Sequence, residues 1–168
     1  CDTVYAVSKE HFSKNWASIE NAQELLNVLN LYELPEAVDI VLTGGEPLIY
    51  ANDPIFIKFL EVLVENGHNI TFDFDEYTVY RDCFFALSVK LSNSHEPLSK
   101  RVRGDTIYNI ASNAKDAFFK FSIDAESINL GLEEELSEIL QHSPKTKVYC
   151  MPLGGNKEEV ELNTEPLI

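Results

Sequence analysis

Short apolar runs alternate along the chain with longer stretches in which apolar residues recur every three or four positions. A short apolar run is typical of a strand in a parallel sheet, and the longer spacing is typical of a helix packed on it. The pattern therefore predicts repeated βα units around a largely parallel sheet, in one domain. We expect strands at Val38–Leu42, Asn69–Phe74, Phe84–Val89, Phe118–Ile123 and Lys147–Met151.

The first predicted helix has apolar residues at spacings of three and four between Ala22 and Leu29. Asn21 followed by Glu24 forms a capping-box-like start for it. Weaker signals predict helices at Thr106–Ala114 and Glu133–Leu140.

The second predicted helix has signals at both ends. Asp53 can cap it, Pro54 fits its first turn, and Asn66-Gly67 supplies a left-handed exit. Its buried stripe is formed by Ile55, Phe59, Val62 and Leu63.

Polar or glycine-rich loops follow three of the predicted strands, at Thr43–Pro47, Ser88–Ser94 and Met151–Gly155. In parallel α/β folds ligands bind at the carboxyl edge of the sheet, where such loops meet. We therefore expect a ligand site to be built from these three loops.

Charge and length exclude some classes of function. The 168 residues carry 28 acidic and 13 basic side chains, a net charge of −15, which would repel a phosphate backbone and disfavours nucleic-acid binding. No apolar run approaches the roughly 20 residues that cross a bilayer, and no signal-like segment opens the chain, so we expect a cytoplasmic location and no membrane. We interpret the glutamate runs as solvated faces. They comprise Glu133, Glu134, Glu135, Glu138, Glu158, Glu159, Glu161 and Glu165.

The three cysteines, Cys1, Cys83 and Cys150, form neither a CxxC pair nor a zinc-binding spacing. A secreted disulfide framework is also a poor fit to this spacing. Cys83 and Cys150 lie beside apolar runs, so we expect both to be small buried side chains.

The segment Leu42-Thr43-Gly44-Gly45-Glu46-Pro47 follows the first predicted strand directly. Two glycines there expose bare backbone and Glu46 adds a carboxylate, which suits a ligand with an ammonium group. The structural alternative is a tight turn in which Glu46 favours a helix start. A phosphate loop is disfavoured, because GxxxxGK[ST] is absent and a carboxylate repels phosphate.

GGEP after a buried strand resembles the motif with which radical S-adenosylmethionine enzymes hold the amino group of that cofactor. Three further segments resemble the 7-carboxy-7-deazaguanine synthase family within that superfamily. Cys1-Asp2-Thr3-Val4-Tyr5-Ala6 is similar to the end of its CxxxCxxC cluster motif, Leu87–Ser94 to its SPKLSNS segment, and Tyr149–Gly154 to its YLMPEG stretch. Spaced matches in the same order are more specific than GGEP alone.

The resemblance implies a partial (β/α)6 barrel of the radical S-adenosylmethionine type. Residues 1–168 would form a single core domain, truncated at both ends, with the first and final strands missing. It also implies that the full-length protein acts as a homodimer.

The resemblance also assigns roles to individual residues. Cys1 would ligate a 4Fe-4S cluster, Thr3 would bind Mg²⁺ as a hard oxygen ligand, and Thr43 would contact substrate. The residues assigned to S-adenosylmethionine are Asp2, Gly44, Gly45, Glu46, Ser88, Val89, Lys90, Met151, Pro152, Leu153 and Gly154. Without the family, Thr3 is a turn cap, Ser88 and Lys90 are a strand-end hydroxyl and a solvated lysine, and the Met151 segment belongs to the core.

The implied reaction converts 6-carboxy-5,6,7,8-tetrahydropterin to 7-carboxy-7-deazaguanine with loss of ammonia, a lyase step of queuosine biosynthesis. A 5′-deoxyadenosyl radical formed from the cofactor would take hydrogen from C6 of the substrate, and hydrogen return would regenerate the cofactor. Mg²⁺ would orient the substrate carboxylate. A flavodoxin-like or ferredoxin-like protein would supply the electron.

The chain departs from the family in three places. The other two cluster cysteines would precede residue 1, so we expect this chain by itself to hold no cluster and to be inactive. After Phe72 the family continues into an ETNG-like turn, whereas this chain continues with Asp73, which predicts skipped sequence or a shortened loop. The chain also stops before the family's final strand and its RLH-like stretch.

Two other functions remain open at this point. Another radical S-adenosylmethionine enzyme, such as a glycyl-radical activating enzyme, would share GGEP and the cluster but would need no magnesium on Thr3. A non-catalytic acidic α/β binding module would use Gly44 and Gly45 only to shape a turn.

Overall fold

A parallel sheet forms the centre of the computed structural model, which describes residues 9–32, 37–43, 47–74 and 81–167. Within those ranges the sheet is open and has five strands, whose order in space is their order in the chain. They are β1 (Asp39–Leu42), β2 (Asn69–Phe74), β3 (Phe84–Leu87), β4 (Asp116–Ile123) and β5 (Lys147–Pro152). All four pairings are parallel, so the carboxyl ends of the strands meet at one edge. The predicted α/β class with a parallel sheet is confirmed.

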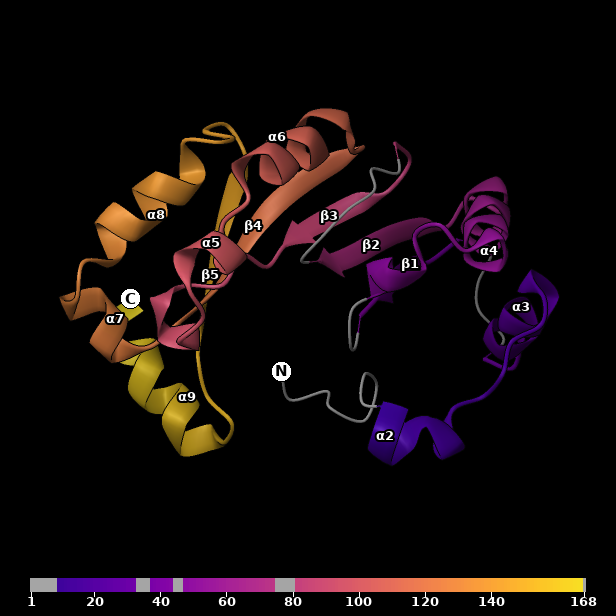
Figure 1. Ribbon diagram of the computed structural model, residues 1–168, viewed down its shortest axis with the longest axis horizontal. Helices are drawn as coiled ribbons and strands as arrows, with labels where there is room; N and C mark the ends of the chain where they lie inside the picture. The colour runs from indigo at the N-terminus through magenta and orange to yellow at the C-terminus, as the bar shows by residue number, and fades with distance from the viewer. Residues whose placement is uncertain (1–8, 33–36, 44–46, 75–80, 168) are drawn as a thin grey trace.

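Helices connect the strands, and α3, α4, α6 and α8 lie along the outer side of the arc that the strands form (Figure 1). The α-helices are α2 (Lys9–Phe12), α3 (Ala22–Asn30), α4 (Pro54–Glu65), α5 (Leu98–Arg101), α6 (Gly104–Asn113), α7 (Ala125–Asn129), α8 (Leu132–Leu140) and α9 (Lys157–Thr164). Four short 3-10 turns are η1 (Ser13–Asn15), η2 (Pro47–Tyr50), η3 (Ser92–Ser94) and η4 (Glu165–Leu167). The described helices are all too short or too polar to cross a bilayer.

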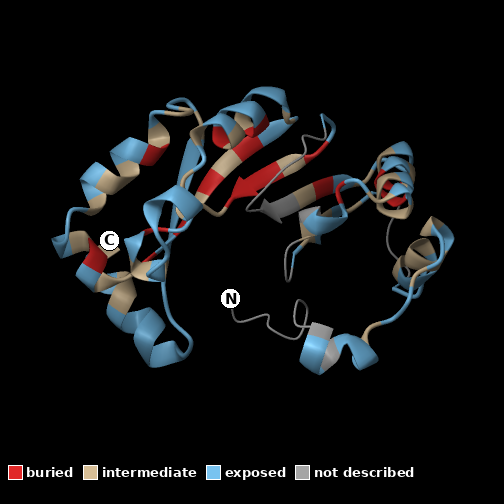
Figure 2. Ribbon diagram, in the orientation of Figure 1, coloured by how far each residue is buried: buried red, intermediate tan, exposed pale blue. Residues whose placement is uncertain are grey.

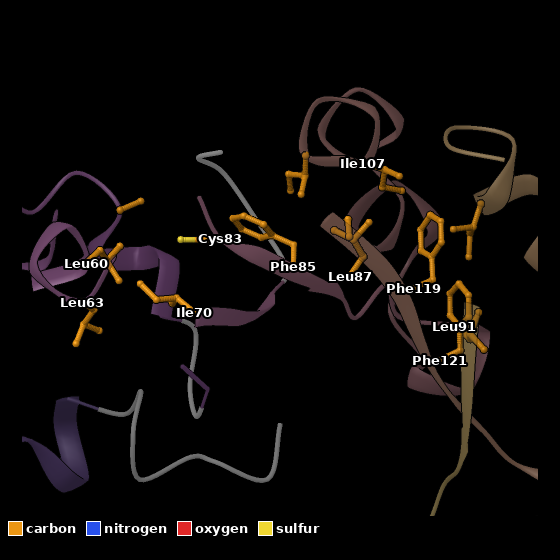
Figure 3. Close-up of a cluster of buried hydrophobic side chains, with 14 of the residues drawn as sticks. Leu60, Leu63, Ile70, Cys83, Phe85, Leu87, Leu91, Ile107, Phe119 and Phe121 are labelled. Carbon is orange, nitrogen blue, oxygen red and sulfur yellow. The ribbon is translucent and has the colours of Figure 1, made fainter. Parts of the chain in front are cut away.

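The hydrophobic core lies between this helical layer and one face of the sheet. Along β4, Ala117, Phe119, Phe121 and Ile123 are buried and alternate with more accessible residues, as the period of a strand requires. Figure 2 shows the buried positions along β3 and β4, and Figure 3 shows side chains of the buried cluster. Helices contribute Phe59, Leu60 and Leu63 from α4, Ile107 and Ile110 from α6, and Ile139 from α8. Each fully buried large side chain contributes roughly 1.5–3 kcal/mol.

Helices α3 and α4 begin as predicted, and α4 also ends as predicted. The Asn21 side chain accepts a hydrogen bond from the Glu24 amide (3.2 Å) at the start of α3. Asp53 Oδ1 accepts hydrogen bonds from the amides of Ile55 (2.8 Å) and Phe56 (3.3 Å) at the start of α4. Gly67 follows α4 with a φ of 81°, the left-handed conformation that a glycine adopts without strain.

Strand β2 has the predicted bounds, Asn69–Phe74. It continues through Phe72 and Asp73, which pair with Phe85 and Ala86 of β3. Skipped sequence or a shortened loop after Phe72 stays a prediction. Strand β3 ends at Leu87, two residues before the predicted end at Val89.

The prediction that both cysteines are buried is confirmed for Cys83 and wrong for Cys150. Cys83 is buried, and burial, reinforced by the charge of Asp82, raises the pKa of its thiol to about 12. Cys150 is exposed, contrary to the prediction. Its strand β5 is the outer strand of the described sheet and is exposed at nearly every position, so an apolar sequence there did not indicate burial.

Candidate ligand-binding cavity

A cavity of about 400 Å³ lies at the carboxyl ends of β3, β4 and β5. One wall is the segment that follows β3, with Ser88, Val89 and Lys90 among its lining residues. The second side is formed by Lys120 and Ser122 of β4. Met151 and Leu153, at the end of β5, complete the described lining on the third side. This volume is in the range of small-molecule and cofactor sites.

The cavity lies on the face of the sheet opposite the helix-packed core. Lys120 and Ser122 alternate along β4 with the buried Phe119, Phe121 and Ile123, so their side chains point to the other face. The register pairs Lys120 with Tyr149 and Ser122 with Met151. Because register partners share a face, β4 and β5 together line the cavity.

The wall after β3 is held by hydrogen bonds within it and to β4. Ser94 Oγ donates to the Leu91 carbonyl (2.7 Å), which closes the turn η3. Asn93 Nδ2 donates to the Ser122 carbonyl (3.1 Å) and to Asp124 Oδ2 (3.0 Å). The Asn93 amide therefore fastens this segment to the end of β4.

A buried ion pair between Arg101 and Glu135 also holds the segment that follows β3. The prediction that Glu135 is solvated is therefore wrong. The side chains of Arg101 and Glu135 are only 8% and 14% exposed, and they form a direct salt bridge. The Glu135 carboxylate also accepts hydrogen bonds from Ser92, from the amide (2.8 Å) and from Oγ (2.9 Å). The remaining glutamates of the two runs are exposed, as predicted.

Arg101 extends this network to the backbone of the wall. Its Nη1 donates to the Lys90 carbonyl (3.0 Å), and its Nε donates to the Glu96 carbonyl (2.8 Å). Side chains from α5 and α8 thus fix the backbone at both ends of the segment between Lys90 and Glu96. A charge-assisted network of this kind restricts the conformation of a loop more than neutral contacts do.

Asp124 is the acidic group at the end of β4. Burial by itself would raise the pKa of its carboxyl, but hydrogen bonds from the amide and hydroxyl of Ser127, from Asn93 and from the Glu126 amide outweigh burial. The net pKa is therefore lowered, and Asp124 is held as a carboxylate. Its Oδ1 caps α7 through Ser127.

The segment after β5 is fixed by Asn163 of α9. Asn163 Nδ2 donates to the Leu153 carbonyl (2.6 Å), and Asn163 Oδ1 accepts from the Ala125 amide (2.8 Å). A Cβ atom on Gly154 would lie 2.7 Å from the backbone nitrogen of Val160. Gly154 therefore permits the close approach of this segment to α9.

The structure brings together five of the residues predicted to bind the cofactor. Ser88, Val89, Lys90, Met151 and Leu153 all line the cavity.

The other predicted residues lie elsewhere in the chain. Pro152 and Gly154 are outside the described lining: Pro152 pairs with the buried Ile123, and Gly154 packs on α9. Thr43 is exposed just after β1, at the opposite margin of the sheet from β5. Cys1, Asp2, Thr3, Gly44, Gly45 and Glu46 lie outside the described residues.

Five residues of the described lining were not predicted as individual site residues: Leu91, Asn93, Ser94, Lys120 and Ser122. Lys120 did carry a signal in the sequence, because it interrupts the apolar run Phe118–Ile123 at a central position. A charged side chain inside a strand is expected only where something compensates its burial. Asn93 lies in the loop Ser88–Ser94 that was expected to contribute to a ligand site, but its bonds to Ser122 and Asp124 could not be predicted, because these partners lie far from it in sequence.

In the ranges that the structure describes, no three His, Cys, Asp or Glu side chains gather as a metal site would require. The positions predicted to bind the cluster and magnesium, Cys1 and Thr3, are not among those residues. Comparison with protein-family models, with curated proteins and with solved structures finds no match to this chain.

Proposed function

We propose that this chain is the core of a radical S-adenosylmethionine enzyme of the 7-carboxy-7-deazaguanine synthase type. One observation carries the proposal: residues from two segments that resemble separate family motifs line one cavity although the segments are distant in the sequence. They are Ser88–Lys90 from the first segment, and Met151 and Leu153 from the second. Ligands of parallel α/β proteins bind at the edge where this cavity lies.

The architecture is compatible with a partial barrel. The open parallel sheet has its helical layer on one face, and the cavity lies on the other. In a partial (β/α)6 barrel that second face would be the lumen. Strand β1 ends at the same edge of the sheet, and GGEP follows this strand in the sequence, which favours its participation in the same site.

The lining residues fit the groups of S-adenosylmethionine. The Ser88 hydroxyl can bond a ribose hydroxyl, and the Lys90 ammonium suits a carboxylate. Met151 and Leu153 supply apolar surface for an adenine ring. When bound, the cofactor and an iron–sulfur cluster would supply one-electron chemistry. The residues of this chain would orient the ligands and exclude water.

In the proposed reaction the substrate is 6-carboxy-5,6,7,8-tetrahydropterin, and the product is 7-carboxy-7-deazaguanine. Thr43 would contact the substrate, while Glu46 would bind the cofactor's amino group. Cys1 would ligate the cluster, and Thr3 would hold Mg²⁺, for which a hydroxyl oxygen is a suitable ligand.

Binding of S-adenosylmethionine to the chain tests the proposal directly. The cofactor should raise the melting temperature with the concentration dependence of mass action. Lys90→Met should weaken this effect, because it removes a cation from the cavity. Lys145→Met removes an exposed lysine ahead of β5 and serves as the matched control. A melting temperature that does not change with cofactor favours a non-catalytic binding module instead.

The substrate is tested by anaerobic reconstitution of the full-length protein with iron and sulfide. Formation of the deazapurine from the carboxypterin, increased by Mg²⁺, supports the proposed reaction. Cofactor cleavage without this product would favour another radical enzyme, such as a glycyl-radical activating enzyme.

A further inference from the structure

Asn66 and Gly67 form the exit of helix α4, ahead of strand β2 (Figure 1). Asn66 is the asparagine of this chain that a glycine follows, and both residues are exposed. In the described part of the chain, a Cβ atom on Gly67 would meet no atom within 4 Å. Because glycine has no side chain to shield its nitrogen, this is the sequence in which an asparagine amide reacts most readily with the next backbone nitrogen.

The reaction of such a pair is deamidation through a cyclic imide. The Gly67 nitrogen attacks Cγ of Asn66, so that a bond forms between them and the bond from Cγ to Nδ2 breaks. The Gly67 nitrogen gives up its proton, and Nδ2 leaves as ammonia. Water then opens the imide at one of its carbonyl groups, which leaves aspartate or isoaspartate at position 66. Water is the co-reactant, and no group is oxidised or reduced.

The backbone conformation of Asn66 keeps the two reacting groups apart. The imide ring needs Cβ of Asn66 and the Gly67 nitrogen on the same side of the Asn66 Cα–C bond. Asn66 has a φ of −85° and a ψ of 5°. This ψ eclipses the Gly67 nitrogen with the Asn66 backbone nitrogen, and therefore turns it away from Cβ. Ring closure requires a rotation of ψ that the helix exit does not allow.

Hydrogen bonds hold this conformation. Asn66 Nδ2 donates to the Val62 carbonyl (2.8 Å), and the Gly67 amide donates to the Val64 carbonyl (2.9 Å). Both reacting groups are thus bonded to carbonyls of the last turn of α4, which a helix cap satisfies in this way. The reaction can therefore occur only after this turn opens locally.

The product of deamidation cannot rebuild the cap. Asn66 Nδ2 is a donor, whereas an ionised carboxylate only accepts hydrogen bonds, so the bond to the Val62 carbonyl is lost. The new negative charge also lies at the negative end of the helix dipole and next to Glu65. Isoaspartate in addition lengthens the backbone between α4 and β2 by a methylene group. Each change favours the open form of the turn.

We propose that Asn66 is a modification site protected by the fold, and that its deamidation permanently loosens the connection between α4 and β2. Opening of the last turn permits the reaction, and the product keeps the turn open. The loss of ammonia makes the change one-way. Because β2 pairs with β1 and β3, the modification acts at a junction with the sheet. The inference does not depend on the proposed function.

Deamidation rates of the folded and the urea-unfolded chain test the protection. Mass spectrometry of the peptide that contains position 66 follows the conversion of amide to acid at mildly alkaline pH. We expect the folded chain to react at least about tenfold more slowly. The factor should match the slowing of hydrogen exchange at the Gly67 amide, because both processes need the same opening. Equal rates in the two states would overturn the proposed protection. A factor as large as that of the β4 core amides would overturn local opening, since the reaction would then follow global unfolding.

A direct replacement tests the effect of the product. Asn66→Asp makes the amide-to-acid change, and loss of the cap bond should speed hydrogen exchange at the Gly67 amide about fivefold. The matched control Asn109→Asp makes the same change at an exposed position in the middle of α6, and should leave that exchange unchanged. Unchanged exchange in Asn66→Asp, or an equal effect of the two variants, would overturn the proposed loosening.

Discussion

Gly154 lies where the segment after β5 approaches α9 most closely. Gly154→Ala would place a Cβ atom 2.7 Å from Val160 N and 2.8 Å from Val160 Cγ2, and backbone must move to relieve this contact. Overpacking of this kind costs typically 1–3 kcal/mol, so we expect the free energy of unfolding to fall by about 2 kcal/mol in urea titrations.

The neighbouring glycine provides the control. A Cβ atom on Gly155 would meet only Glu159 Oε2, at 3.6 Å, which is ordinary van der Waals contact. Gly155→Ala should therefore change the urea midpoint much less than Gly154→Ala. Equal midpoints for the two variants would show that α9 adjusts at no cost.

Asp124 should make the fold sensitive to acid. Its folded-state pKa lies below its ordinary value because hydrogen bonds to Ser127 and Asn93 favour the carboxylate over the cost of burial. A lowered pKa means that the stabilisation is present above the ordinary Asp value, about 3.9, and is lost as pH falls through the folded-state value. Asp124→Asn should therefore reduce stability at neutral pH and much less at low pH.

Urea unfolding of the wild type and Asp124→Asn between neutral and acidic pH measures this difference. The gap between their free energies of unfolding should narrow as the pH falls below about 4. A gap that stays constant with pH would mean that Asp124 contributes through shape and not through its charge.

At the scale of elements, the Arg101–Glu135 pair joins α5 and α8 to the cavity wall. Glu135→Ala would leave Arg101, only 8% exposed, without its counter-ion. Removing one partner of a buried pair typically costs 3–5 kcal/mol, and we expect a loss of about 3 kcal/mol in urea unfolding. Glu138→Ala on the same helix removes an exposed carboxylate and should change stability by about 0.5 kcal/mol or less.

A double replacement separates two contributions of the Arg101–Glu135 pair: the effect of its charges on stability, and the effect of its hydrogen bonds to the cavity wall on ligand binding. Arg101→Met with Glu135→Leu removes both charges together, and it should recover much of the stability lost in Glu135→Ala. The bonds to Ser92 and Lys90 would still be absent, so ligand binding should remain weakened. Full recovery of binding would mean that the pair contributes to stability alone.

The sequence was sufficient to predict elements whose signals are local. Helix α4 was predicted to its ends because Asp53 and Pro54 mark its start and Gly67 its exit. The strands were predicted from their apolar runs, since a sheet covered by helices requires buried residues at regular positions.

The elements missed by the sequence analysis lack that apolar signal. Helix α9 is almost entirely exposed and was interpreted only as part of a solvated acidic run. It is fixed by Asn156, which caps it, and by Asn163, which bonds to Leu153 and Ala125. Only the capping signal of Asn156 followed by Glu159 was visible in the sequence.

Only part of the cavity was predicted. The parallel βα pattern predicted that a ligand site lies at the carboxyl edge of the sheet, and the family resemblance predicted lining residues in two loops. The Arg101–Glu135 pair could not be predicted, because 34 positions separate its members and Glu135 sits in a run of glutamates. Which glutamate of such a run turns inward depends on the docking of α8, which composition does not specify.

At the scale of the whole molecule, the net charge of −15 makes the folded chain repel itself. Raising NaCl from about 0.01 M to about 0.15 M shortens the screening length from about 30 Å to about 8 Å. The melting temperature should therefore rise with salt over this range. Glu134→Gln with Glu158→Gln should reduce the rise, because both carboxylates are exposed and contribute to the repulsion. A melting temperature that falls with salt would mean that attractive ion pairs dominate.

The contacts of Asn93 have a consequence for how occupancy of the cavity can be observed. Asn93 lines the cavity and bonds to Asp124, whose other oxygen accepts the Ser127 amide at the start of α7. A ligand that immobilises Asn93 would also immobilise the Asp124 cap of α7. Deuterium uptake at the Ser127 amide would then slow when ligand binds. Helix α7, which lies outside the cavity, would therefore report on ligand binding without an added label.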